Sequence, residues 1–121
     1  MVQWVPVIVC LIIEGIITAI LGYFAWPYAF IGAIVGTLTV GAWVDEDASN
    51  GAIHGALVGL CGFIIAMLLV LGIGLPAMLV VGASTTLTGV VLAGLAILLI
   101  IAYVIPGAIF GAIGVVIRKA V

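Results

Sequence analysis

Charged side chains are scarce in this sequence, which has only four acidic and two basic residues among its 121 positions. A water-soluble protein of this length leaves much of its chain in contact with solvent and needs charged side chains to cover it. Hydrophobic residues instead make up 69% of the chain, and the mean hydropathy is +1.72. The sequence therefore excludes a soluble globular domain and indicates an integral membrane protein whose main partner is the lipid bilayer.

Basic patches, metal-ligand clusters and catalytic motifs are missing as well. The net charge of −2 offers no surface for a nucleic acid. One histidine, two cysteines within apolar runs (Cys10 and Cys61) and a few acids in one segment fall short of a metal-ligand set. The sequence holds no recognisable pair of nucleophile and base and no glycine-rich phosphate loop. We therefore expect no enzyme, no metal and no cofactor.

The apolar runs predict an all-α fold. A bilayer leaves no partner for unpaired backbone groups, so spanning segments are helices or closed barrels, and these unbroken runs lack the alternation of barrel strands. A hydrocarbon core of about 30 Å requires about 20 helical residues. Four runs fit, which predicts one integral membrane bundle of four transmembrane helices at residues 4–26, 28–44, 51–71 and 86–117.

Proline, glycine and polar residues mark the ends of the first three helices. Residues 26–28, Trp-Pro-Tyr, suit a turn at the membrane interface. Residues 45–50 form the only strongly polar segment, and either Ser49 or Asn50 is expected to cap the third helix. Residues 72–76, Gly-Ile-Gly-Leu-Pro, are expected to break that helix.

The fourth predicted helix is longer than one span requires and contains Pro106, which predicts a kink near Ile105. An alternative places an extra span or re-entrant segment at residues 77–83, giving five membrane segments. Arg118 and Lys119 are the only basic residues, and the positive-inside tendency places them in the cytoplasm. With four helices, both termini are then cytoplasmic in a multi-pass protein of the cell membrane. We expect no cleaved signal peptide, because the N-terminus has no basic region.

A pattern of small residues, Gly-Ala-Ile-x-Gly, occurs three times and extends as stripes along the predicted helices. Small side chains let helix backbones approach closely. Because lipid tails are as apolar as the side chains, the hydrophobic effect does not hold membrane helices together, and close van der Waals packing and Cα–H···O contacts do so instead. Packing within one bundle and packing between copies in a homo-oligomer both fit this pattern. The predicted helix-packing residues are Gly32, Gly36, Gly51, Gly55, Gly59, Gly107, Gly111 and Gly114.

Glu14 is the main candidate for chemistry, because about ten apolar residues on each side place it near the middle of the first helix. An ionisable group there costs roughly 2.5–3.5 kcal/mol, so such groups usually face protein or water and often serve transport. Cys10 and Thr18 share its helix face, and Thr37 lies at a similar depth as the expected partner of its carboxyl. A dry site would favour the neutral acid in a structural role, whereas a wet one would allow proton or cation handling.

His54, the only histidine, lies about one turn inside the polar segment. We expect it to lie at the interface and pair with Asp45, Glu46 or Asp47.

The acidic segment leads into Gly51-Ala52-Ile53-His54-Gly55, and the chain closes on Pro106-Gly107-Ala108-Ile109-Phe110-Gly111. With the Trp-Pro turn, this arrangement resembles a group of small archaeal glycine-rich four-helix membrane proteins of unknown function. The resemblance implies a fold but no activity.

Small multidrug transporters are similar in length, helix count and a glutamate in the first helix. The sequence departs from them around Glu14, in lacking a lysine in the following loop, and in lacking an aromatic pattern in the third helix. We therefore expect a non-enzymatic structural or accessory protein whose helices pack through the glycine stripes. It is expected to form an oligomer or part of a larger membrane complex. The alternative is a proton-coupled transporter or ion channel that uses Glu14.

Overall fold

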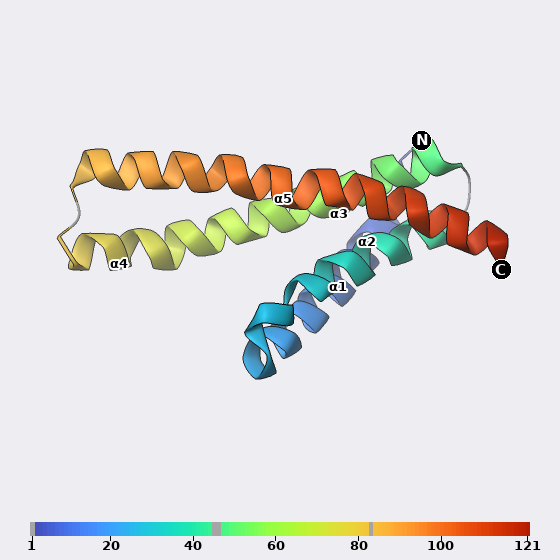
Figure 1. Cartoon of the computed structure of the whole chain (residues 1–121), viewed down its shortest axis with the longest axis horizontal. Helices are drawn as coiled ribbons and strands as arrows, with labels where there is room; N and C mark the ends of the chain where they lie inside the picture. The colour runs from blue at the N-terminus through green and yellow to red at the C-terminus, as the bar shows by residue number, and fades with distance from the viewer. Residues whose placement is uncertain (1, 45–46, 83) are drawn as a thin grey trace.

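The computed structural model describes residues 2–44, 47–82 and 84–121, and nearly all of them are helical. Figure 1 shows two helical hairpins that meet near the chain termini. The short hairpin consists of α1 and α2, and the long hairpin of α3, η2, α4 and α5. The elements are α1 (Trp4–Phe24), the 3₁₀ turn η1 (Trp26–Tyr28), α2 (Phe30–Val44), α3 (Ala48–Leu69), the π-helical turn η2 (Val70–Gly74), α4 (Leu75–Val80) and α5 (Thr85–Ala120).

Among the residues that the structure describes, three helices are long and apolar enough to cross a membrane, namely α1, the continuous helix Ala48–Val80 and α5. The helix α2 is equally apolar but has 15 residues, fewer than the hydrocarbon core requires. The prediction of an all-α, membrane-embedded protein is confirmed. At about 1.5 Å per residue, the 33-residue helix Ala48–Val80 extends about 50 Å, well beyond a core of about 30 Å.

The prediction that residues 72–76 break the third helix is wrong, although α3 itself ends at Leu69, close to the predicted end near residue 71. In η2 the hydrogen-bond register shifts by one residue, so that the N–H of Leu75 donates to the carbonyl of Val70. A π turn of this kind accommodates the missing donor of Pro76, which lies in the first turn of α4. The helix therefore passes through the Gly-Pro segment, and residues 77–80 continue it instead of forming a separate membrane segment; Ala83 lies outside the described residues.

The last helix runs from Thr85 to Ala120 and passes Pro106 without a break (Figure 1). Its first turn is capped by Ser84, whose hydroxyl accepts a hydrogen bond of 3.1 Å from the N–H of Leu87. The turn before it depends on Gly82, whose φ of +78° lies in the left-handed region that favours glycine.

The two hairpins share one polar end, where Figure 1 shows both termini. Asp47, not Ser49 or Asn50, caps α3, because its side chain accepts a hydrogen bond of 2.7 Å from the N–H of Asn50. Arg118 at the end of α5 donates to the carbonyl of Ala42 in the last turn of α2, at 3.1 Å. A cation there complements the negative end of the helix dipole.

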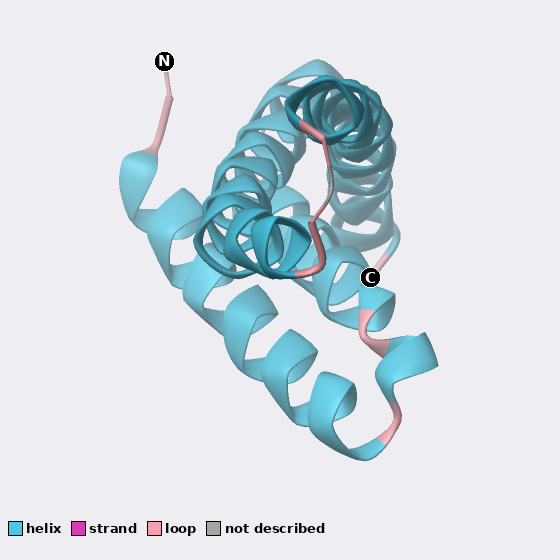
Figure 2. Ribbon diagram, turned by 90° about the vertical axis from the view of Figure 1, so that its left-hand side faces the viewer, coloured by secondary structure: helices cyan, strands magenta, loops and turns pink. Residues whose placement is uncertain are grey.

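From the polar end the hairpins diverge. The short hairpin packs across one side of the long hairpin, with α2 contacting both α3 and α5 (Figures 1 and 2). Close backbone contact between the arms of the long hairpin is made by α3 and α5, and η2 and α4 contribute little to it. The far part of the long hairpin therefore extends beyond the short one, with apolar side chains such as Leu68, Val80 and Leu98 exposed.

Candidate functional site

Glycines bring α3 and α5 into backbone contact. A Cβ atom built on Gly111 would lie 2.8 Å from the Cα of Gly55 and 3.0 Å from its N. A Cβ atom on Gly55 would in turn lie 2.8 Å from the Cα of Gly111. These neighbours are backbone atoms that no rotamer change can move, so only a hydrogen atom fits at either position.

The other predicted packing glycines also lie at contacts within the chain. On α2, a Cβ atom at Gly32 would lie 2.9 Å from the carbonyl oxygen of Glu14, and one at Gly36 would lie 2.7 Å from the Glu14 Cβ. Gly41, which continues the small-residue stripe of α2 beyond Gly36, meets the backbone of Gly111. Added Cβ atoms at the remaining members would also meet neighbouring helices: Gly51 and Gly107 across the α3–α5 contact, Gly59 against Tyr103, and Gly114 against Leu38 and Ala42 of α2.

Glu14 lies where three helices meet, and its side chain is 5% exposed. Two glycines make the space for its carboxyl group. A Cβ atom on Gly36 of α2 would lie 3.1 Å from Oε2, and one on Gly62 of α3 would lie 3.0 Å from Oε1. The carboxyl is therefore held between two helices of different hairpins by residues that have no side chain of their own.

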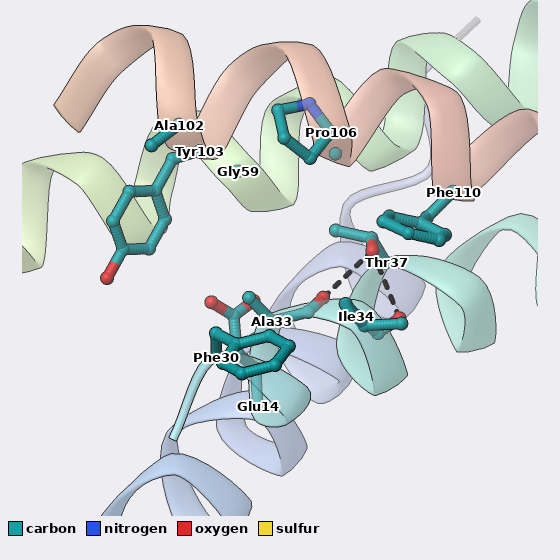
Figure 3. Close-up of a pocket in the computed structure, with 11 residues that line it drawn as sticks. Glu14, Phe30, Ala33, Ile34, Thr37, Gly59, Ala102, Tyr103, Pro106 and Phe110 are labelled. Carbon is teal, nitrogen blue, oxygen red and sulfur yellow. Dashed lines mark hydrogen bonds between the residues drawn. The ribbon is translucent and has the colours of Figure 1, made fainter. Parts of the chain in front are cut away.

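Thr37 does not bind Glu14, so the predicted pairing is wrong. The Thr37 hydroxyl donates within its own helix, to the carbonyl oxygens of Ala33 at 2.8 Å and Ile34 at 3.1 Å (Figure 3). This local bond is the usual one for a helical threonine in an apolar setting. Within the described part of the chain, Oε2 of Glu14 is buried and has no hydrogen-bond partner.

Two adjacent cavities, of about 270 and 500 Å³, lie against Glu14 between the hairpins. We refer to them together as the Glu14 cleft. The larger one extends along α1 past Thr18, which is half-buried. Both cavities are lined mainly by apolar side chains, and they share Glu14, Phe30, Ala33, Ala102 and Tyr103.

The wall opposite Glu14 contains residues of α5 that sequence reasoning missed. Tyr103 of α5 places its ring beside Gly62, where an added Cβ would lie 3.1 Å from the ring carbon Cδ1. Pro106 has no N–H, so the carbonyl of Ala102, one turn earlier, has no donor at its regular helical position. Ala102, Tyr103 and Pro106 all line the smaller cavity (Figure 3). The signal in the sequence was the single tyrosine of a long apolar helix, three residues before its proline.

His54 lies outside this cleft and binds backbone groups. Its ring is fully buried; Nε2 accepts a hydrogen bond of 2.9 Å from the N–H of Gln3, and Nδ1 lies 2.8 Å from the carbonyl oxygen of Asn50. Because Nε2 accepts and Nδ1 faces an acceptor, the ring is neutral with its proton on Nδ1. The predicted pairing with Asp47 is therefore wrong, and Asp45 and Glu46 lie outside the described residues. His54 instead ties the start of α1 to α3.

No group of three or more histidine, cysteine or acidic side chains with metal-binding geometry occurs among the residues that the structure describes.

Comparisons with known proteins give a family and no function. No curated protein and no solved structure gives a significant match. The model of a family of unknown function, DUF5518, matches residues 4–117, a range that includes every helix from α1 to nearly the end of α5. The chain therefore belongs to the DUF5518 family.

Proposed function

We propose that this protein is a non-enzymatic, multi-pass membrane protein that handles protons or a small protonatable molecule at Glu14. The observation that carries the proposal is the Glu14 side chain, which lines an apolar cleft and whose buried Oε2 has no hydrogen-bond partner among the residues that the structure describes. An ionisable group in the interior of a transmembrane helix costs roughly 2.5–3.5 kcal/mol, so it is a functional candidate by default.

The surroundings of Glu14 favour this role over a purely structural one. A structural carboxyl in a dry site is expected to be satisfied by hydrogen bonds, since buried polar groups without partners are rare and costly. The nearest predicted partner, Thr37, bonds to its own helix. The larger cavity, of about 500 Å³, lies within the range typical of small-molecule sites, and the smaller one, of about 270 Å³, lies just below that range.

In the topology that we propose, all four helices cross the membrane, with α2 as the short fourth span. Exposed aromatic side chains at the α1–α2 turn, Tyr23, Tyr28 and Phe30, suit the interface opposite the polar end. The long hairpin exceeds the bilayer thickness and therefore tilts, in keeping with its divergence from the short hairpin (Figure 1). We propose that the polar end, with both termini, faces the cytoplasm, because Arg118 and Lys119 lie there and basic residues favour the cytoplasmic side.

Flux measurements on protein in liposomes test this function. A pH gradient imposed across the vesicles should drive proton flux in the wild type, and Glu14→Gln should abolish it because the amide cannot exchange a proton. The matched control is Thr37→Val, which removes a hydroxyl from the same cleft without touching the carboxyl. Wild-type vesicles that remain as proton-tight as empty ones, with or without added amines, would disprove the proposal.

A second candidate is a structural or accessory role in a homo-oligomer or a larger complex. The observation that favours it is a set of glycines with no atom within 4 Å of an added Cβ, among them Gly89 and Gly94 of α5. Such open positions let a further helix approach closely. Single-molecule photobleaching in lipid would count the copies, and Gly94→Leu should reduce that count if this face binds another copy.

A further inference from the structure

The larger cavity of the Glu14 cleft is an apolar space of about 500 Å³ between the two hairpins. Of the described residues that line it, only Glu14, Thr18 and Tyr103 have polar side chains, and glycine and alanine make up half of the lining. Oε2 of Glu14 is buried, and Thr18 is half-buried. The surface that this cavity offers to an occupant is therefore almost wholly apolar.

The cavity opens at the side of the protein. Phe30, Ile65 and Leu69 line it, and these side chains are 60%, 47% and 58% exposed, respectively. They belong to α2 and α3, whose hairpins diverge away from the polar end (Figures 1 and 2). Because the protein is membrane-embedded and the exposed side chains around the opening are apolar, the opening faces the acyl chains of the bilayer.

From this geometry we infer that an acyl chain of a bilayer lipid occupies the larger cavity and lies beside Glu14. The inference goes beyond the proposed function, because it requires no proton exchange at Glu14. An unoccupied cavity deprives its walls of van der Waals contacts. An acyl chain supplies these contacts at no cost in hydrophobic free energy, since it moves from one apolar setting to another.

The length of the cavity suits a chain from one leaflet. The cavity follows α1 from Leu11 to Ala19, which is about 12 Å at about 1.5 Å per residue and comparable to half of a hydrocarbon core of about 30 Å. Ala29 and Phe30 line it next to the α1–α2 turn. In the proposed topology, the chain therefore belongs to a lipid of the leaflet opposite the polar end.

A helix from a second copy of the protein fits this space less well. One helical turn, with a diameter of about 10–12 Å and a pitch of about 5.4 Å, fills about 420–610 Å³. The cavity therefore holds about a single turn, whereas a helix that crosses the membrane has several. An acyl chain is only one methylene group wide, so it enters where a helix does not.

Photo-crosslinking of the full-length protein in phosphatidylcholine vesicles tests the inference. A small fraction of the lipid carries a diazirine in the middle of one acyl chain, and tandem mass spectrometry locates the residues labelled on irradiation. Ala33 of α2 and Ala66 of α3 are half-buried and line the cavity, so both should carry label. Gly55, buried in the α3–α5 contact, should carry none, and exposed Ile64 gives the level of labelling at the outer surface.

A side chain that fills the cavity should exclude the lipid. Gly15 of α1 lines the cavity, and no atom lies within 4 Å of an added Cβ. Gly15→Leu should therefore lower the label at Ala33 and Ala66, relative to Ile64, by about fivefold, because its side chain takes the space of the acyl chain. Gly89→Leu, at an open glycine outside the cavity, is the matched control and should leave this ratio unchanged.

Two results would overturn the inference. One is label at Ala33 and Ala66 no higher than at Gly55, and the other is an equal loss of label in both leucine variants. If circular dichroism shows that Gly15→Leu does not fold, Ala66→Phe fills the cavity from α3 and should lower the label at Ala33 instead. Proton flux is measured separately, so a failure of this inference leaves the proposed function standing, and an absence of flux leaves the acyl-chain site standing.

Discussion

Substituting Gly111 by alanine tests the central contact of the bundle. Gly111 faces Gly55 of α3, and its carbonyl oxygen lies against Gly41 of α2, so three helices meet at this residue. An added Cβ would lie 2.8 Å from the Cα of Gly55 and 3.0 Å from its N, closer than real Cβ atoms tolerate. To accept the methyl group, α3 and α5 must move apart along the whole contact.

The matched control is Gly94→Ala, the same substitution in the same helix. No atom lies within 4 Å of a Cβ atom on Gly94. Both variants gain about 0.8–1.0 kcal/mol of helix propensity, which cancels in the comparison. What remains is the cost of overpacking, typically 1–3 kcal/mol, so Gly111→Ala should be less stable than Gly94→Ala by about that amount.

Unfolding in mixed micelles with increasing dodecyl sulfate measures this difference. Circular dichroism and the fluorescence of the three tryptophans follow the transition, and Gly111→Ala should unfold at lower dodecyl sulfate than either Gly94→Ala or the wild type. Equal midpoints for the two variants would show that α3 and α5 do not touch through their backbones at Gly111, and the packing described for this fold would be refuted.

Two smaller predictions concern the polar end. Asp47→Ala removes the cap of α3 and should cost about 1 kcal/mol in the same unfolding assay, whereas Ser49→Ala should cost almost nothing; the reverse order would assign the cap to Ser49. His54→Leu removes the acceptor of the Gln3 N–H and should cost about 1–3 kcal/mol, with His54→Gln losing less because its side-chain carbonyl can accept the same bond. Hydrogen exchange at the start of α1 should rise in His54→Leu, and unchanged exchange there would refute the tie between α1 and α3.

The all-α class follows from the sequence because the polar backbone of an apolar segment must satisfy its own hydrogen bonds in lipid, which a helix does. The position of the α2–α3 connection was also predictable, since residues 45–50 form the only strongly polar segment. The continuation of the third helix through η2 and α4 was not. Glycine and proline usually end a helix in water, but inside a long apolar helix a π turn before Pro76 keeps the backbone hydrogen-bonded, and the helix continues to Val80.

The candidate site was predictable in one half only. Helical periodicity placed Cys10 and Glu14 on one face of α1, and both are buried. The opposite wall, Ala102 and Tyr103, belongs to a helix almost 90 residues later, and no local pattern connects the two. Thr37 lies at the right depth but bonds to its own helix, a preference that depth alone does not reveal.

The glycine contacts and the cleft have a common cause. From Gly51 to Gly62 the face of α3 that meets α5 and Glu14 is made of glycines, and the backbones are in contact there. Beyond Gly62 the same helix presents larger side chains, such as Ile65 and Leu69, and these line the larger cavity. The hairpins therefore separate at the point where the glycines end. Glu14 lies at that point, held between Gly36 and Gly62, so close packing on one side positions the carboxyl and loose packing on the other leaves room beside it.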